Sequence, residues 1–179
     1  MGDGKTLDKQ QIYKGKVVDL AVEKVELPNG AVTDLEVIRH PGAAAVVPLN
    51  SNGDVLLVRQ YRHAIGGWLL EVPAGKLDPG ELPETCAARE LEEEVGYRPD
   101  ILISLGWIWT TPGFTDERIW LYLARGLVAG QQALESDEVL SVESVPFDEA
   151  VGRVHSGEIC DGKSVCALLR SAAYLGAEK

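Results

Sequence analysis

The sequence contains few sulfur-containing and aromatic residues: its 179 residues include three cysteines, one methionine and two phenylalanines. Cys86, Cys160 and Cys166 have neither the even number nor the spacing of a disulfide framework or a zinc site. A free cysteine commonly behaves as a small buried hydrophobe. We therefore expect three reduced thiols with structural roles.

Long apolar runs and basic clusters are also missing. The longest apolar runs, such as residues 43–49, are too short to cross a bilayer, and residues 1–11 lack the apolar core of a secretory signal. The net charge is −11, and no cluster of lysine or arginine offers a surface for a nucleic-acid backbone. We therefore expect a cytoplasmic protein with no nucleic-acid partner and no membrane partner.

The composition is that of an average globular protein, with 45% hydrophobic and 25% charged residues, in a chain whose length suits one domain. Valine-rich stretches at 17–27 and 31–38 flank the turn sequence Pro28-Asn29-Gly30, which predicts an N-terminal hairpin. A second hairpin is predicted around the turn formers at 50–54. Further strands are expected at residues 43–49, 55–59, 68–72, 101–108, 119–124 and 139–145.

The hydrophobic period becomes helical between residues 82 and 95, where apolar side chains recur at intervals of three and four. Gly96 is expected to end this helix, and Leu82 is a poor cap, so its first turn should fray. Two more helices are predicted near the end of the chain, one after Pro146 with Asp148 near its cap and one following Ser164. Strands mixed with helices at this length predict a three-layer α/β/α sandwich with a mixed β-sheet.

Acidic residues crowd onto one face of the helix predicted at 82–95. Glu90, Glu93 and Glu94 are three or four positions apart, so their carboxylates project from the same side. Like charges at this spacing destabilise a helix, and a divalent cation would neutralise them. Magnesium prefers such oxygen ligands and keeps coordination positions for phosphate oxygens. The alternative is an ordinary solvated acidic face.

Residues 75–97 read GKLDPGELPETCAARELEEEVGY, and this segment resembles the Nudix box, G-x5-E-x7-R-E-U-x-E-E-x-G-U, in which U is aliphatic. All seven single-residue positions agree, whereas Tyr97 replaces the final aliphatic residue. The chain is accordingly similar to the Nudix hydrolases. The resemblance implies the Nudix fold for residues 41–179, an α/β three-layer sandwich, with residues 1–40 as an N-terminal hairpin extension.

The resemblance also implies roles for the residues of the box. The cation, Mg²⁺ or alternatively Mn²⁺, would be bound by Glu90, Glu94, the assisting Glu93 and the backbone carbonyl of Ala74. The structural positions of the box would be Gly75, Glu81, Arg89 and Gly96. In this family the arginine and the first glutamate pair and hold the loop against the helix.

Three segments outside the box resemble the ADP-ribose pyrophosphatase branch: residues 58–62 (VRQYR), 71–75 (EVPAG) and 111–117 (TPGFTDE). Pro112 stands fifteen residues after Tyr97, as a proline does in that branch. The resemblance implies Mg²⁺-dependent hydrolysis of ADP-ribose to AMP and ribose 5-phosphate. Two alternatives stay open: another nucleotide sugar such as GDP-mannose, and a non-catalytic module that senses ADP-ribose.

Candidate substrate contacts lie in the same three segments. Arg62 offers a guanidinium fork for phosphate oxygens, although it could also be a surface arginine on a strand end. Glu71 would contact a ribose or order water, or else form a structural ion pair. Phe114, near Pro112, offers an aromatic face for adenine, while Trp107 and Trp109 are expected mainly to pack in the core.

Hydrolysis also requires a carboxylate that accepts a proton from the attacking water. In the branch that this chain resembles, the base often lies on a loop before a late strand, and residues 134–138 occupy that place. We favour Glu138 over Glu135 as the base, with Glu93 as the remaining alternative. The resemblance further implies a homodimer formed through the N-terminal hairpin. The number of metals and the phosphorus attacked stay open.

Overall fold

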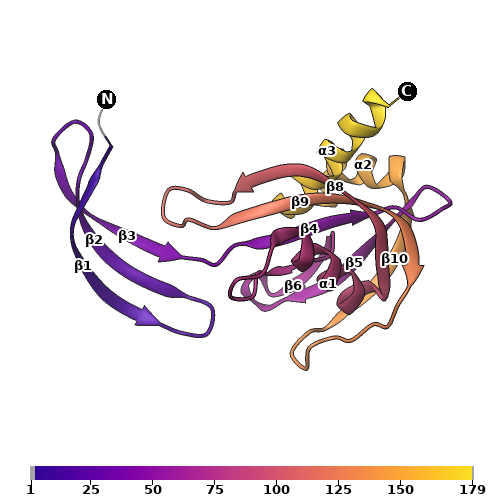
Figure 1. Ribbon diagram of the computed structural model, residues 1–179, viewed down its shortest axis with the longest axis horizontal. Coiled ribbons are helices and arrows are strands. Elements are labelled where there is room, and N and C mark those ends of the chain that lie inside the picture. The colour runs from indigo at the N-terminus through magenta and orange to yellow at the C-terminus, as the bar shows by residue number, and fades with distance from the viewer. Residues whose placement is uncertain (1–2, 179) are drawn as a thin grey trace. The chain divides into compact units, whose positions relative to one another are not determined.

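The computed structural model describes residues 3–178, and Figure 1 shows the order of their strands and helices. The contacts divide the chain into two compact units. The first comprises the residues up to Gly42 together with Trp109–Arg118, and the second comprises Ala43–Ile108 and the residues from Ile119 onward. Each unit is described by itself.

The first unit is built on a three-stranded antiparallel sheet. Its strands are β1 (Lys5–Lys14), β2 (Asp19–Glu26) and β3 (Val32–Arg39), in that order. The hairpin predicted at residues 17–38 forms β2 and β3, with Gly30 in the left-handed conformation at the turn (φ 82°). The sequence did not predict β1. Every residue of β1 is exposed, so no alternation of apolar and polar side chains marks the strand.

Residues 110–117 pack against the end of β3 within this first unit. Ile38 donates its N–H to the carbonyl of Phe114 at 2.8 Å, and Asp116 donates its N–H to the carbonyl of Ile38 at 3.3 Å. Arg39 donates to the carboxylate of Asp116 at 3.0 Å and to that of the buried Glu23 at 2.7 Å. This backbone and side-chain pairing fixes the segment that carries Phe114.

The second unit contains a mixed sheet of four strands in the order β7 (Ala74–Lys76), β4 (Ala43–Pro48), β9 (Arg118–Ala129) and β8 (Tyr97–Trp109). β4 runs parallel to β9 and antiparallel to β7. All six residues of β4 are buried, as is usual for a strand covered on both faces. A second, antiparallel sheet has the order β10 (Leu140–Pro146), β5 (Asp54–Arg62) and β6 (Gly67–Glu71), and the short 3-10 helix η1 (His63–Ile65) joins β5 to β6.

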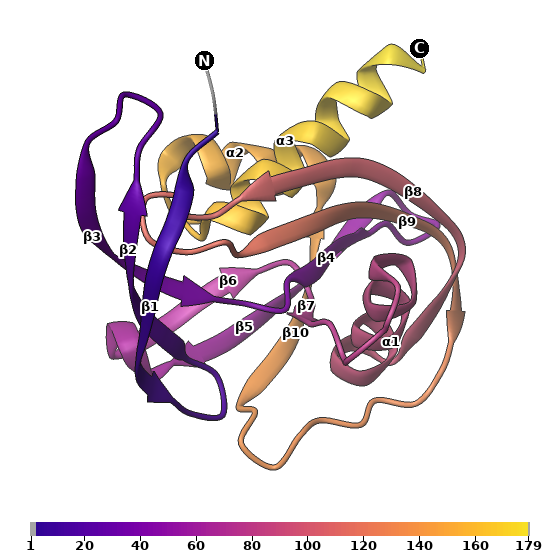
Figure 2. The ribbon, with the colours of Figure 1, turned by 60° about the vertical axis from the view of Figure 1, so that its left-hand side comes forward.

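Helices cover both faces of the sheets in this unit (Figure 2). Ala44 and Val46 of β4 pack with apolar residues of α1 (Pro83–Val95), including Leu91. The alternate β4 residues, such as Val47, lie in a second cluster that contains Ala150 of α2 (Phe147–Ser156) and Leu168 of α3 (Gly162–Ala177). The predicted three-layer α/β/α arrangement with a mixed sheet is therefore confirmed. No helix within residues 3–178 is long and apolar enough to cross a membrane.

The helix ends agree only partly with the sequence-based expectations. α1 has Leu82 at its N-cap without a side-chain cap and ends at Gly96, whose φ is 79°. The helix predicted after Pro146 is confirmed as α2, which starts at Phe147 with Pro146 as its N-cap and has Asp148 in its first turn. α3 starts at Gly162, ahead of Ser164, because Asp161 caps it by accepting the N–H of Ser164 at 3.0 Å.

The expectation of buried structural cysteines holds for only one of the three. All three cysteines are free thiols. Cys86 is a buried residue of α1, Cys166 is partly buried, and Cys160 is exposed. The exposure of Cys160 corrects the expectation, since it lies in the short connection before α3 rather than on a packed face.

Candidate active site

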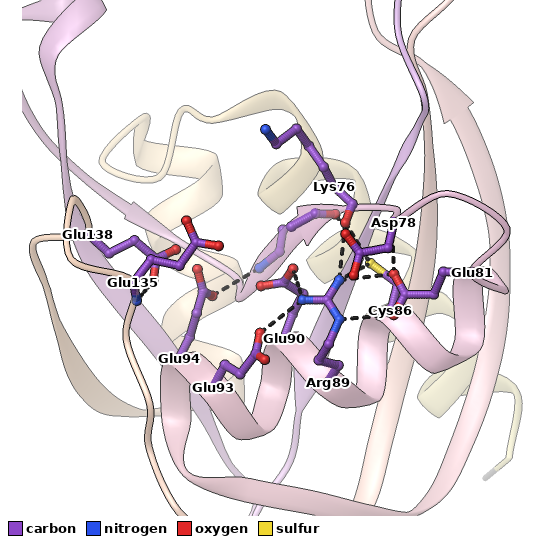
Figure 3. A network of polar contacts seen from close by, with 12 residues as sticks. Lys76, Asp78, Glu81, Cys86, Arg89, Glu90, Glu93, Glu94, Glu135 and Glu138 are labelled. Atoms are coloured by element: carbon purple, nitrogen blue, oxygen red, sulfur yellow. Dashed lines mark hydrogen bonds and ion pairs between the residues drawn. The ribbon is translucent and has the colours of Figure 1, made fainter. Parts of the chain in front are cut away.

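Arg89 joins the loop before α1 to the helix itself (Figure 3). Its guanidinium donates two hydrogen bonds to the carboxylate of Glu81, at 2.9 and 3.0 Å, and one to the carbonyl of Lys76 at 3.1 Å. The same group donates to Glu90 at 2.7 Å and to Glu93 at 2.9 Å. The paired bonds from Arg89 lower the pKa of Glu81 to about 2. The single guanidinium of Arg89 thus holds three carboxylates and the carbonyl at the end of β7 in place.

Glu90 and Glu94 are acidic side chains buried on the inner face of α1. The side chain of Glu90 is 10% exposed, and the whole residue Glu94 is 1% exposed. Burial raises the pKa of Glu90 to about 7, and burial together with the charge of Glu90 raises the pKa of Glu94 to about 8. Glu94 also accepts the N–H of Ala74 at 3.1 Å. Two negative charges buried beside each other are costly, and a bound cation would neutralise them.

Gly75 lies directly against Glu90. A Cβ atom built at position 75 would overlap with the carboxylate oxygens of Glu90. Only a residue without a side chain therefore allows the Glu90 carboxylate to lie against β7. The residue before it, Ala74, is already fixed by its N–H bond to Glu94, so the strand and the helix meet at this point.

The donor set fits a hard divalent cation such as Mg²⁺ or Mn²⁺. Glu90 and Glu94 supply carboxylate oxygens beside β7, and the backbone of Ala74 lies at the same place. Glu93, like Glu90, is paired with Arg89. Within residues 3–178, no three acidic, histidine or cysteine side chains form a cluster that could hold a metal by themselves. The residues present would hold a cation through two side chains and backbone oxygen, with substrate oxygens and water completing the shell.

The loop after β9 is fastened to the end of α1. Gly130 donates its N–H to the carbonyl of Gly96 at 2.8 Å, and Ala133 donates its N–H to the carbonyl of Glu93 at 2.9 Å. The side-chain amide of Gln132 donates to the carbonyl of Glu94 at 2.7 Å. Sequence reasoning missed Gln132, because a polar residue in a loop has no periodicity that would single it out.

This loop brings Glu135 and Glu138 to the acidic end of α1 (Figure 3). The negative charge of Glu138 contributes to the raised pKa of both Glu90 and Glu94, although burial is the larger cause. Glu135 donates its backbone N–H to the carboxylate of Glu138 at 2.9 Å. The side chain of Glu138 therefore lies near the two buried carboxylates. The backbone N–H of Glu135 orients the carboxylate of Glu138.

Arg62 forms an ion pair with the buried Glu71 beside the acidic residues. Nε and Nη2 of Arg62 donate to the two carboxylate oxygens of Glu71 at 2.9 and 2.7 Å. Lys163 donates to the same carboxylate. Burial opposes ionisation of Glu71, but these two cations lower its pKa overall. The bonds to Glu71 raise the pKa of Arg62, and the charge of Glu94 adds a smaller increase. This effect of Glu94 shows that Arg62 lies near the acidic site. Sequence reasoning did not identify Lys163.

The aromatic candidates differ from the expectation. Trp107 and Trp109 are 42% and 41% exposed, so the prediction that they pack mainly in the core was wrong. The guanidinium of Arg118 lies 4.5 Å from the centre of the Trp109 ring and makes a cation–π contact with it. Phe114 is 50% exposed on the segment that pairs with β3, and Pro112 lies on the same segment.

Comparisons with known proteins show which proteins this chain resembles. A family model of the NUDIX domain matches residues 39–167. The chain is 42% identical over 166 residues to the ADP-ribose pyrophosphatase of Bacillus subtilis (strain 168), covering 92% of this chain and 90% of that protein. It is equally similar, with the same coverage, to the methanol dehydrogenase activator of Bacillus methanolicus, at 42% identity. The crystal structure of an ADP compounds hydrolase has a TM-score of 0.87 at 21% identity, covering 99% of this chain and 97% of the other, and so shares the fold.

Proposed function

The chain belongs to the Nudix family, and on that premise we propose that it hydrolyses the diphosphate of ADP-ribose to AMP and ribose 5-phosphate. The observation that carries the proposal is the pair of buried carboxylates, Glu90 and Glu94, beside Gly75. The activity named for the Bacillus subtilis relative supports the substrate.

Mg²⁺, with Mn²⁺ as an alternative, is the cation we propose for this site. Its residues would be Glu90, Glu94 and the carbonyl of Ala74, with Glu93 joining them if it leaves Arg89. A bound divalent cation would neutralise charge on the diphosphate oxygens. The loop and the helix would be held in position around the cation by four structural residues, Gly75, Glu81, Arg89 and Gly96.

The remaining steps belong to the side chains of the chain itself. Arg62 would bind phosphate oxygens with the N–H groups that it does not share with Glu71. Water would attack one phosphorus, forming a P–O bond as the bond from that phosphorus to the bridging oxygen breaks. Glu138 would accept the proton from the water, with Glu135 and Glu93 as the alternative bases. Phe114 and Pro112 would line the place of the adenine.

A homodimer formed through the N-terminal strands and a cytoplasmic location complete the proposal. Several apolar side chains are exposed on these strands, among them Leu7, Ile12 and Leu35. Exposed apolar surface of this kind favours association. Sedimentation of the full chain would test the dimer, with a monomer at micromolar concentration as the contradicting result.

A substrate panel tests the proposed function. The protein is incubated with Mg²⁺ and ADP-ribose, GDP-mannose, NADH or a diadenosine polyphosphate, and the products are separated by ion-exchange chromatography. We expect AMP and ribose 5-phosphate, with the highest kcat/KM for ADP-ribose. A clear preference for GDP-mannose would move the chain to the other nucleotide-sugar activity. Binding of ADP-ribose without turnover would identify a sensing module.

A further inference from the structure

The carboxylate of Glu71 is shared between two cations rather than held by one. It is 1% exposed and accepts two hydrogen bonds from Arg62, at 2.9 and 2.7 Å. The ammonium of Lys163, whose side chain is 11% exposed, donates to the second oxygen of the same carboxylate. Lys163 is 92 positions from Glu71 in the chain, so the contact joins α3 to the end of β6.

The first turn of α3 fixes the position of Lys163. Asp161, the N-cap, accepts from the ammonium of Lys163 at 2.9 Å and from the N–H of Ser164 at 3.0 Å. The hydroxyl of Ser164 donates to Asp161 at 2.6 Å and accepts the N–H of Val72 at 2.9 Å. The turn is therefore bonded to the residue that directly follows Glu71, and Lys163 has little freedom to leave.

The charges around Glu71 balance only when Lys163 is present. Arg62 and Lys163 carry two positive charges, and Glu71 and Asp161 carry two negative ones. A carboxylate as buried as Glu71 needs its oxygens fully bonded, because an unpaired buried charge is costly. Lys163 donates the third hydrogen bond to the carboxylate of Glu71, so the guanidinium of Arg62 donates to it through Nε and Nη2 only. Among residues 3–178, Nη1 of Arg62 has no hydrogen bond, and the side chain is 38% exposed.

We propose that Lys163 is a positioning residue for Arg62: by sharing Glu71 through the capped first turn of α3, it fixes the guanidinium so that Nη1 is available to a diphosphate. The identity of that ligand rests on the proposed function. A guanidinium fixed before binding loses little conformational freedom when it meets phosphate oxygens, so the effect falls on binding rather than on the chemical step.

The kinetic test uses Lys163→Met and the conservative Lys163→Arg in the full chain with Mg²⁺ and ADP-ribose. Lys163→Met is expected to raise KM about tenfold and to change kcat by less than about threefold, equivalent to about 1.4 kcal/mol of lost binding. Lys163→Arg should recover most of the affinity. Arg153→Met, which removes a cation from the Glu149 and Glu158 pairs on α2, is the matched control and should change neither constant. An unchanged KM in Lys163→Met overturns the proposal.

A measurement without substrate separates this proposal from the proposed function. The ¹⁵Nε–¹Hε resonance of Arg62, assigned with Arg62→Lys, should be sharp in the wild type and should broaden or shift in Lys163→Met. A raised KM with an unchanged Arg62 resonance would mean that Lys163 contacts the phosphate itself, which also overturns positioning. If the wild type does not cleave ADP-ribose, the proposed function is wrong. The Arg62 resonance still decides whether Lys163 positions Arg62. Should Lys163→Met fail to fold, Lys163→Gln takes its place with the same expected results.

Discussion

Gln132 donates its side-chain amide to the carbonyl oxygen of Glu94 at 2.7 Å, and this bond ties the loop after β9 to the helix of the acidic residues. The last carbonyls of a helix have no partner within the helix. Here the loop supplies partners through Gln132 and through the backbone N–H groups of Gly130 and Ala133. The candidate base and the candidate metal ligands are thereby held by one set of bonds.

Replacing Gln132 by alanine should loosen this loop without touching a carboxylate. We expect kcat for ADP-ribose to fall about tenfold, as expected for the loss of about 1.4 kcal/mol of positioning in the transition state. Gln131→Ala is the matched control, because Gln131 contributes only a backbone N–H, to Glu92 at 3.4 Å. Equal losses in the two variants would show that the side-chain bond of Gln132 does not position the loop.

Glu138→Gln should remove the proton acceptor and leave the shape of the loop unchanged. Since a general base contributes typically 10²–10⁴-fold, we expect kcat to fall at least about a hundredfold with KM nearly constant. Glu135→Gln should cost less than about tenfold, because Glu135 contacts Glu138 through its backbone N–H. Steady-state kinetics at several pH values decide between them. A larger loss for Glu135→Gln would exchange the two assignments.

Gly75→Ala should displace the carboxylate of Glu90, because the added methyl group occupies its place. We expect a loss of Mn²⁺ affinity of at least about tenfold by isothermal titration calorimetry, together with a loss of turnover. Gly152→Ala, at an open position inside α2, is the matched control and should stabilise the fold by about 0.5–1 kcal/mol. Unchanged Mn²⁺ binding in Gly75→Ala would argue against Glu90 as a ligand.

The raised pKa values of Glu90 and Glu94 predict a specific dependence of stability on pH. Both rise from 4.5, to about 7 and about 8. Between pH 4.5 and 8 the metal-free folded protein therefore holds more protons than the unfolded chain, so its stability falls as pH rises. Glu81, which pairs with Arg89, has a pKa of about 2, so its carboxylate is already ionised in the folded protein throughout this range.

Thermal unfolding in EDTA and in Mg²⁺ measures this effect. We expect Tm in EDTA to decrease from pH 5 to pH 8, and saturating Mg²⁺ to remove most of the decrease, because metal binding displaces the protons. Apparent Mg²⁺ affinity should rise up to tenfold per pH unit for each proton displaced. In Glu94→Gln the decrease should be smaller. A Tm that rises with pH in EDTA would contradict the assignment of the two buried carboxylates.

The features that sequence predicts well here are local. The helix at 82–95 is marked by its apolar period and by Gly96, and the structure has α1 at Pro83–Val95. The fully buried β4 is recognisable as an unbroken apolar run. These signals depend on residues within one or two turns or strands of each other, which is why they can be read without the tertiary structure.

The features that sequence misses depend on distant contacts or on surfaces without a pattern. Lys163 meets Glu71 across 92 positions, and neither residue type nor spacing indicates this pairing. β1 is exposed along its whole length and lacks the alternation by which a strand is recognised. The start of α3 was misplaced because Ser164, a typical cap residue, is itself held by the true cap, Asp161.

Crystals grown with Mn²⁺ and a non-cleavable α,β-methylene analogue of ADP-ribose give the most direct test of the central claim. Anomalous scattering locates the metal, and the analogue locates the diphosphate. The account predicts Mn²⁺ bound by the carboxylates of Glu90 and Glu94, with phosphate oxygens in its shell and Arg62 on the diphosphate. An analogue bound at this site while no Mn²⁺ contacts Glu90 or Glu94 would contradict it.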